Sequence, residues 1–295
     1  MTVRSRCEVL SSRAAGAFQS VTLVAPEIAE RARPGQFVEV AMPEGRASVL
    51  RRPLFIHQAS RRGGWAGTVE LIVDRQGPGT SWLAGTSAHE FVDLIGPLGN
   101  GFGIPRPTNC LLVGVGYAAA PLYFLAEELR SRGKRVDMLV GAPSQDRLLK
   151  PIEGKRLAHS ITIVTEDGSV GERADPLDVL PECMQRWRTQ VVYAAGPRRL
   201  IRQVADHCRA QKVPAQIAVE ELMACGLGLC LSCAVPVSGP HGKGLAHARA
   251  CVEGPVFSAG RILWDRWLGT PPGAEPAPED ETGSVEPGPP VRSGR

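Results

Sequence analysis

Short apolar runs separated by turn signals divide the first third of the chain into predicted strands. The runs, each bounded by glycine, proline or charged residues, are Val21–Val24, Gln36–Val40, Val69–Val73 and Phe91–Ile95. Regular short strands with β-branched residues are typical of antiparallel β structure. We therefore expect residues 1–105 to form a small antiparallel barrel.

The pattern changes after Pro105, where strand-like runs alternate with helix-like segments. The strand-like runs are Cys110–Val113, Val136–Val140, Ser160–Val164 and Gln190–Tyr193, and the helix-like segments are Ala119–Arg132, Asp175–Leu180 and Arg199–Gln211. Such alternation predicts a mostly parallel sheet covered by helices. The predicted fold class is therefore a β-barrel (1–105) plus an α/β domain (106–212).

Two further segments complete the predicted organisation. Residues 213–268 carry a concentration of cysteines, and we treat them as a third unit. Residues 269–295 are rich in proline, glycine, glutamate and serine. Such a composition cannot bury enough apolar surface to fold, so we expect a disordered tail.

Composition and charge narrow the function classes. The 295 residues are 43% apolar and 22% charged, which suits a soluble globular protein with more than one core. The net charge of +4 and the dispersed arginines give no case for nucleic-acid binding. No apolar stretch has membrane-spanning length, and the N-terminus lacks the apolar run of a signal peptide. With unpaired thiols, these features predict a cytoplasmic protein.

Four cysteines carry the most specific chemical signal. Cys225, Cys230 and Cys233 have the spacing C-x4-C-x2-C, and Cys251 follows downstream. This is the plant-type ligand spacing for a [2Fe–2S] cluster, whose irons take thiolate ligands. Glycines inside the loop permit the tight curl and close backbone approach that a compact cluster needs.

Zinc and disulfides are the competing interpretations of these cysteines. Structural zinc sites usually pair two C-x2-C knuckles, whereas Cys251 has only His247 nearby as a second ligand type. The other four cysteines, Cys7, Cys110, Cys183 and Cys208, are scattered and expected to be buried thiols.

Two glycine turns in the α/β region resemble phosphate-binding loops. Gly114 and Gly116 follow the strand at Cys110–Val113 and precede a helix, which directs backbone N–H groups toward an anion. Gly196 lies in the turn after Tyr193. The third glycine of the usual fingerprint is missing, so tight strand–helix turns without a ligand remain the alternative.

Two barrel motifs also suit a pyrophosphate. Arg52 before the rigid Pro53 can present a bidentate fork, and Gly79 with Thr80 offers backbone donors and a hydroxyl at a helix start. Taken alone, Arg52 is a solvated charge and Gly77–Thr80 a simple turn. The order of the three parts along the chain, a barrel, then a nucleotide-type fold and then a cysteine loop, favours the ligand-binding interpretation of these motifs together.

These motifs together carry a family resemblance over residues 3–268. The matching strings are Pro34–Phe37, Arg51–Leu54, Gly77–Thr80, Gly96–Phe102, Glu221–Cys233 and Ala250–Phe257. The layout resembles the ferredoxin-reductase superfamily, and within it the electron-transfer subunits of class 1B dihydroorotate dehydrogenases.

The resemblance implies an oxidoreductase subunit with FAD, a [2Fe–2S] cluster and NAD(H) as co-substrate. In such proteins electrons pass from NADH through FAD and the cluster to the FMN of a separate catalytic subunit, which oxidises dihydroorotate in pyrimidine biosynthesis. A hetero-oligomer, specifically a heterotetramer, is therefore expected. The chain itself shows no catalytic residue for dihydroorotate.

Site residues follow by position from the resemblance. The residues expected to line FAD are Arg52, Pro53, Leu54, Phe55, Ile72, Val73, Asp74, Gly79 and Thr80. Those expected to border the nicotinamide nucleotide are Gly114, Gly116 and Gly196. The expected cluster ligands are Cys225, Cys230, Cys233 and Cys251.

The chain departs from the family at two places. Phe55 stands where the family usually has a small hydroxyl residue near the reactive part of the flavin, and a phenyl group cannot donate that hydrogen bond. At the nucleotide turn, Val115, Tyr117 and Ala118 stand where the family is richer in glycine, which crowds the pyrophosphate position.

Two other functions fit the same motifs. One is a reductase subunit that serves a hydrogenase or another flavoenzyme. The other is a sensor that binds flavin and cluster without turning over NADH, which Phe55 and the altered turn suggest. The choice between NADH and NADPH stays open, since Ser144–Arg147 provides neither a clear ribose-binding acid nor a definite phosphate clamp.

Overall fold

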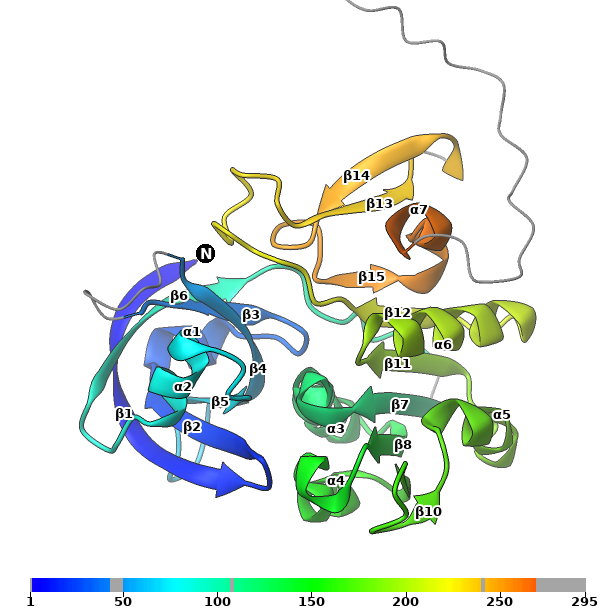
Figure 1. Ribbon diagram of the computed structural model, residues 1–295, viewed down its shortest axis with the longest axis horizontal. Coiled ribbons are helices and arrows are strands. Elements are labelled where there is room, and N and C mark those ends of the chain that lie inside the picture. Colours follow the sequence, from blue (N-terminus) through cyan, green and yellow to red (C-terminus); the bar gives the residue numbers. More distant parts are fainter. Residues whose placement is uncertain (1, 43–49, 107–108, 240–241, 269–295) are drawn as a thin grey trace, which may run out of the picture.

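The N-terminal part of the computed structural model is a closed antiparallel barrel (Figure 1). The structure describes residues 2–42, 50–106, 109–239 and 242–268; the predicted tail, 269–295, lies outside them. In barrel order the strands are β1 (Val3–Ala15), β2 (Phe18–Val24), β5 (Thr68–Val73), β4 (Arg52–Ser60), β3 (Phe37–Val40) and β6 (Phe91–Leu98). Two short helices accompany the barrel, α1 (Pro26–Arg31) and α2 (Pro78–Ala84).

Four of the six barrel strands coincide with the predicted apolar runs, and two were not predicted. In β1 only Cys7 and Val9 are fully buried, so this strand has no run of buried apolar residues that would reveal it in the sequence. β4 begins at Arg52 and Pro53, which we interpreted only as a ligand motif. The Pro53 position is compatible with a strand because a proline can stand as an early residue of one.

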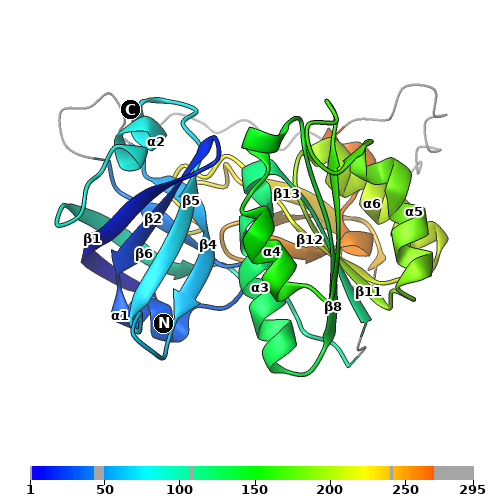
Figure 2. The ribbon, with the colours of Figure 1, turned by 90° about the horizontal axis from the view of Figure 1, so that it is seen from below.

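The second unit is a mostly parallel sheet with helices on both faces. Its strand order is β10 (Glu172–Arg173), β9 (Ser160–Thr165), β8 (Arg135–Ala142), β7 (Asn109–Val115), β11 (Val191–Ala195), β12 (Ala215–Ala218) and β15 (Val256–Ser258). The helices that follow the strands are η1 (Gly116–Ala119), α3 (Ala120–Ser131), η2 (Gln145–Arg147), α4 (Pro151–Leu157), α5 (Pro176–Arg186) and α6 (Arg198–Ala210). Figure 2 shows α3 and α4 between the sheet and the barrel, with α5 and α6 on the other side.

The cysteine segment is attached to the edge of this sheet. It contains a hairpin of β13 (Ala234–Ser238) and β14 (Leu245–Arg249), strand β15, η4 (Ala259–Arg261) and α7 (Trp264–Leu268). β15 pairs antiparallel with β12, so the segment extends the sheet by one strand. Since β12 pairs in parallel with β11, we propose that the cysteine unit begins after Ala218 rather than at residue 213.

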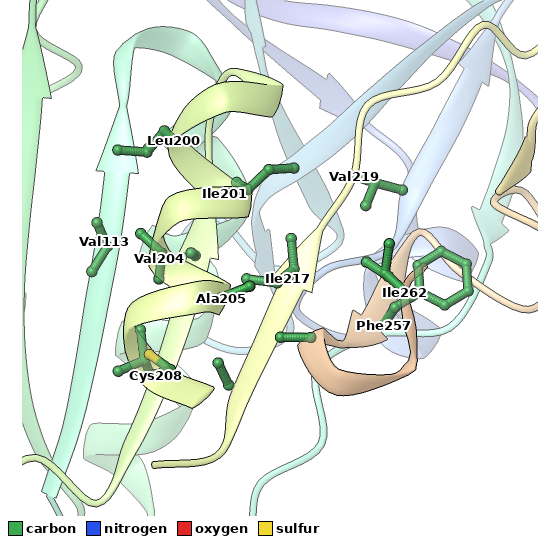
Figure 3. Packing of buried hydrophobic residues seen from close by; sticks show 14 of the residues in the cluster. Val113, Leu200, Ile201, Val204, Ala205, Cys208, Ile217, Val219, Phe257 and Ile262 are labelled. Carbon is green, nitrogen blue, oxygen red and sulfur yellow. The ribbon is translucent and has the colours of Figure 1, made fainter. Parts of the chain in front are cut away.

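A shared hydrophobic core joins the sheet and the cysteine segment. Figure 3 shows Ile201 and Val204 of α6 facing Ile217 of β12, with Phe257 of β15 beyond that strand. The same cluster of buried residues includes Cys233 and Cys251. Burial of this continuous apolar surface fixes the cysteine loop relative to the sheet. Within the described ranges, none of the helices combines the length and the apolar content needed to cross a membrane.

Candidate functional site

A cleft of about 210 Å³ opens where the barrel meets the α/β unit and the segment after β12. Its barrel wall consists of Phe37, Arg52, Pro53, Leu54, Phe55, Ile72, Asp74, Gln76 and Thr80. Its opposite wall consists of Tyr117, Ala120, Val219, Glu220, Glu221, Met223 and Pro255. The cleft is therefore built from three parts of the chain that lie far apart in sequence.

The structure brings most of the predicted flavin residues together in this cleft. Arg52–Phe55, Ile72, Asp74 and Thr80 all line it. Val73 does not, because its side chain is fully buried in the barrel core. Gly79 lies directly behind the wall, where a Cβ atom would stand 2.7 Å from Met42 Sδ and 3.3 Å from Arg52 Nε.

Local hydrogen bonds fix the turn that carries Thr80. The backbone N–H groups of Gln76 and Gly77 donate to Thr80 Oγ1 at 3.0 and 3.2 Å. The hydroxyl thereby satisfies two donors at the start of α2, as a capping side chain does. Asp74, at the other end of this turn, accepts a bond of 2.7 Å from Arg147 of η2, which ties the barrel wall to the sheet unit.

The three predicted nucleotide glycines lie at neighbouring strand ends but outside the lining of the cleft. β11 pairs with β7 so that Ala195 faces Gly114, which places Gly196 beside the first turn. A Cβ on Gly114 would lie 2.6 Å from Ala119 Cβ, and one on Gly196 would lie 2.6 Å from Leu200 Cδ2. Close helix packing therefore accounts for these two glycines.

Gly116 differs from the other two glycines. Its φ is +58°, and a Cβ there would meet open space. Because no neighbouring atom covers the Cβ position of Gly116, this is the part of the turn that a ligand can approach closely.

The far wall of the cleft holds a hydrogen-bonded pair that sequence reasoning did not find. Tyr117 donates its hydroxyl to Glu220 Oε2 at 3.1 Å, across 103 positions of sequence. Burial raises the pKa of the Glu220 carboxyl, and it also raises the pKa of Tyr117. The tyrosine therefore stays protonated and remains a donor at neutral pH.

The four predicted cluster ligands form two pairs at the tip of the cysteine segment. Cys233 and Cys251 are buried, with 3.3 Å between their sulfur atoms. Cys230 is exposed and its thiol interacts with that of Cys225. The backbone N–H groups of Leu227 and Leu229 each donate to Cys225 Sγ at 3.4 Å, as amides do toward cluster sulfurs.

Cys230 and Cys251 differ in their affinity for protons. A hydrogen bond with the Ser232 hydroxyl lowers the pKa of Cys230 to about 6. Burial raises the pKa of Cys251 to about 12, and its neighbour Cys233 adds to this effect. Metal binding releases thiol protons, so Cys251 undergoes a larger change of protonation than Cys230 when a positive ion binds.

The loop between Cys225 and Cys230 packs against strand β3 of the barrel. A Cβ on Gly226, whose φ is +63°, would lie 2.2 Å from Glu39 Oε1 of β3. Glu39 is 1% exposed, and neither carboxylate oxygen has a hydrogen-bond partner among the described residues. Burial raises the pKa of Glu39 to about 7, against the opposing attraction of Arg51 and Arg52.

The donor set fits a [2Fe–2S] cluster better than a zinc ion. Each iron of such a cluster takes two protein ligands, and the thiols are arranged in two pairs. All eight cysteines are free thiols, so the structure contains no disulfide framework.

An apolar rim surrounds the exposed edge of the cysteine loop. Leu229 is 81% exposed, Leu222 72% and Leu231 61%. Leu229 and Leu231 flank Cys230 in the chain, and the Ser232 hydroxyl donates to Leu222 O, so the three exposed leucines belong to one loop region. Exposed leucines grouped in this way are typical of a protein contact.

Comparisons with known proteins match this geometry. Residues 220–263 match the family model described as the iron-sulfur cluster binding domain of dihydroorotate dehydrogenase B. The dihydroorotate dehydrogenase B (NAD+) electron transfer subunit of Desulforamulus reducens is 37% identical over 246 residues, which cover 82% of this chain and 90% of the relative. The chain belongs to this family of electron transfer subunits.

Further relatives and a solved structure agree with this assignment. A probable electron transfer subunit from Methanopyrus kandleri is 34% identical over 250 residues, 85% of this chain and 88% of that protein. The structure of an NADH-dependent reduced ferredoxin–NADP oxidoreductase superposes with a TM-score of 0.76 at 27% identity, covering 90% of this chain and 92% of that one. The predicted family and fold class are thereby confirmed.

Proposed function

We propose that this electron transfer subunit carries electrons from NADH through FAD and a [2Fe–2S] cluster to a flavin in a partner protein. FAD would occupy the cleft against Arg52–Phe55, and the cluster would be held by Cys225, Cys230, Cys233 and Cys251. NADH would bind at the Gly116 turn. The partner would be the FMN-containing catalytic subunit of a dihydroorotate dehydrogenase, in a cytoplasmic heterotetramer that serves pyrimidine biosynthesis.

The observation that carries this proposal is the short connection between the cleft and the cysteine loop. Met223 lines the cleft and is buried, and Cys225 follows it by two positions. Two residues span at most about 7 Å of extended chain. A cofactor in the cleft and a cluster on the loop are thus held close together by the backbone itself.

The side chains of the cleft suit a flavin dinucleotide. Arg52 supplies a guanidinium for the pyrophosphate, and the Thr80 turn lies beside it on the same wall. Leu54, Phe55 and Ile72 provide apolar surface for the ring system and exclude water from it. Bound flavin supplies the conversion between a two-electron hydride donor and a one-electron cluster.

The apolar rim suits the exit of electrons to a partner. Cys230 lies at the exposed edge of the loop, among Leu229 and Leu231. A partner that covers these leucines would bring its own cofactor toward the cluster. The same contact would stabilise the complex by burying apolar surface.

Reconstitution tests the proposed function. The purified chain, loaded with FAD and cluster, would be mixed anaerobically with an FMN-containing dihydroorotate dehydrogenase subunit from the same organism. We expect dihydroorotate oxidation coupled to NAD+ reduction, and we expect the mixture to elute as one complex. Separate elution without coupled turnover would contradict the proposal.

One observation favours a different partner as a second candidate. The solved structure with a TM-score of 0.76 concerns a ferredoxin–NADP oxidoreductase and flavin-based electron bifurcation. A reductase role toward a hydrogenase or another flavoenzyme uses the same cleft and loop. Recovery of such an enzyme with the chain from its native host, without an FMN barrel protein, would favour this candidate.

Phe55 is the observation that favours the third candidate, a redox sensor. It lines the cleft, where its phenyl group offers no hydrogen-bond donor to a flavin. If NADH leaves the bound FAD oxidised while dithionite reduces it, the sensor function replaces the reductase function.

A further inference from the structure

A pocket of about 370 Å³, here called the basic pocket, opens at the end of the parallel sheet away from the Gly116 turn. It is lined by Arg130, Gly133, Lys134, Arg135 and His159. Arg135 is the first residue of β8 and His159 directly precedes β9, so the pocket lies at the amino ends of these strands. The Gly116 turn follows the carboxyl end of β7, which runs parallel to β8. The length of β8, eight residues or roughly 26 Å, therefore separates the basic pocket from the nucleotide turn.

The charged side chains that the described residues contribute to the basic pocket are cations. Arg135 is paired at 2.8 Å with the buried Asp137, so its charge is balanced. Arg130 and Lys134 have no carboxylate partner among the described residues, and backbone carbonyls hold their side chains instead. The pocket thus carries two positive charges without a described counter-charge.

The carbonyl contacts fix these two cations but leave most of their donors unused. Arg130 Nη1 donates to the carbonyls of Arg156 and Leu157, at the end of α4, at 2.9 and 3.0 Å. Lys134 Nζ donates to the Arg106 carbonyl at 3.2 Å. Within the described part of the chain, the Nε and Nη2 atoms of Arg130 make no further bond. Capping of a helix end explains the bonds of Arg130 Nη1, and its remaining donors are available to a ligand.

His159 adds a neutral donor whose tautomer is fixed by the backbone. The Val136 N–H donates to His159 Nδ1 at 3.1 Å, so the ring carries its proton on Nε2. The His159 N–H in turn donates to the Val136 carbonyl at 2.7 Å, which holds this residue beside the start of β8. The Nε2–H group therefore stays a donor as long as the Val136 bond is kept.

The end of α3 leaves the basic pocket open to a ligand. Gly133 has a φ of +69°, and no atom lies within 4 Å of the position that a Cβ would take there. Its N–H donates to the Arg130 carbonyl at 2.9 Å, and the Lys134 N–H donates to the Leu129 carbonyl at 3.0 Å. These carbonyls at the helix end are already bonded, so an anion would meet side-chain donors rather than free carbonyl oxygens.

We propose that the basic pocket binds phosphate, free or as the terminal group of a small phosphorylated molecule. A phosphate group accepts several charge-assisted hydrogen bonds at once, and arginine and lysine are its usual partners in proteins. Arg130 supplies a guanidinium, Lys134 an ammonium group and His159 a neutral N–H. The volume of about 370 Å³ lies within the range of small-molecule sites. This site is separate from the cofactor cleft and does not depend on the proposed function.

Calorimetric titration of the full chain, loaded with FAD and cluster, tests the site at constant ionic strength. The two probes are inorganic phosphate and glycerol 3-phosphate. Arg130→Gln and Lys134→Gln should each weaken binding of the probes about tenfold, as the loss of one charge-assisted hydrogen bond would. Arg266→Gln is the matched control, because Arg266 is an exposed arginine of α7 outside the pocket, and it should bind both probes like the wild type. The absorption spectra of bound FAD and cluster report that each variant is folded.

The relative affinity of the two probes identifies the source of the phosphate. Tighter binding of glycerol 3-phosphate assigns the site to a phosphorylated metabolite, and equal or tighter binding of inorganic phosphate assigns it to the free ion. Either result supports the proposal when Arg130→Gln and Lys134→Gln weaken the binding. Failure of the wild type to bind either probe, or equal binding by the wild type and both variants, would overturn it. Binding of a polyglutamate peptide in place of both probes would assign the pocket to an acidic protein surface and would also overturn it.

Discussion

The cysteine loop and the cofactor cleft are adjacent, yet they are built in opposite ways. Three of the four predicted cluster ligands come from one loop of nine residues, Cys225–Cys233, and their spacing alone led to the prediction. The cleft takes its walls from β4, η1 and the segment after β12, which are separated by about half the chain. A site formed by one loop is visible in sequence, whereas a site formed between units depends on their packing.

The two regions also differ in how they tolerate change. The loop depends on a few contacts that leave no space, such as Gly226 against Glu39. The cleft depends on many side chains of moderate individual effect. We therefore expect single substitutions to abolish the cluster but only to weaken the cleft, and the following predictions test that contrast from the largest effect to the smallest.

Loss of one thiolate should have the largest effect. Cys230→Ser removes a ligand from one iron, so we expect iron and sulfide to fall from two of each per chain to near zero. FAD content should stay at the wild-type level because the cleft does not include Cys230. Cys183→Ser, which changes a buried thiol elsewhere, should keep the cluster; normal iron in Cys230→Ser would disprove the ligand assignment.

Adding a methyl group to the loop, in Gly226→Ala, should lower the iron content almost as much as the loss of a thiolate. In Gly226→Ala the new Cβ would stand 2.2 Å from Glu39 Oε1, at a φ of +63° that disfavours alanine. We expect most of the iron to be lost while FAD is retained. Gly244→Ala is the control, since Gly244 has a φ of +71° in the same segment but open space around its Cβ position.

A second variant shows whether the clash itself is the cause. Glu39→Ala removes the carboxyl group that the new methyl group meets, so Gly226→Ala combined with Glu39→Ala should recover part of the iron. No recovery would mean that the backbone strain at Gly226, rather than the contact with Glu39, holds the loop in place.

The buried Glu39 carboxyl should make stability depend on pH. Its pKa is raised from 4.5 to about 7, so the folded state holds a proton that the unfolded state releases. The corresponding stability is complete below pH 4.5 and is lost as the pH rises through 7. Between pH 5 and pH 8 the free energy of unfolding should therefore fall by about 2 to 3 kcal/mol through this group.

Glu39→Gln provides the comparison, because an amide does not titrate in this range. Denaturant unfolding of both proteins at pH 5 and pH 8 should show a smaller pH dependence in the variant. Glu27→Gln, on the exposed side of α1, should behave like the wild type. Equal pH dependence in Glu39→Gln and the wild type would show that Glu39 is not the group responsible.

The smallest predicted effect belongs to the cleft. Thr80→Ala removes the oxygen that accepts from the N–H groups of Gln76 and Gly77, which costs about 1 kcal/mol. We expect FAD to bind about fivefold more weakly, as measured by fluorescence titration. Thr86→Ala removes a hydroxyl at the other end of α2, where it bonds Leu83 O, and should leave FAD affinity unchanged.

The sequence predicted some parts of the molecule and not others for physical reasons. The strands rich in β-branched residues, such as β2 and β5, were recognisable because their buried residues are apolar. β1 was not, because charged and polar residues cover most of its length. Glu39 was predicted only as part of a strand, since its burial depends on a loop nearly two hundred residues away.

The same distinction applies to the site. Arg52–Phe55 and Thr80 lie in short motifs, whereas Asp74 was assigned by position from the resemblance, and the structure places all of them in one cleft. Nothing local indicated that Tyr117 would meet Glu220, because their contact depends on the sheet order in which β11 lies between β7 and β12. Gly114 and Gly196 were expected to border a nucleotide, and their nearest neighbours are helix side chains.

The central claim is that electrons pass from FAD in the cleft to a cluster on the cysteine loop. Anaerobic stopped-flow mixing with NADH tests this claim most directly. The FAD absorption should bleach first and the cluster signal in electron paramagnetic resonance should follow, with three electrons taken up per chain because FAD holds two and the cluster one. In Cys230→Ser the flavin phase should persist and the cluster phase should vanish. A cluster that NADH reduces before the flavin, or without it, would contradict this account.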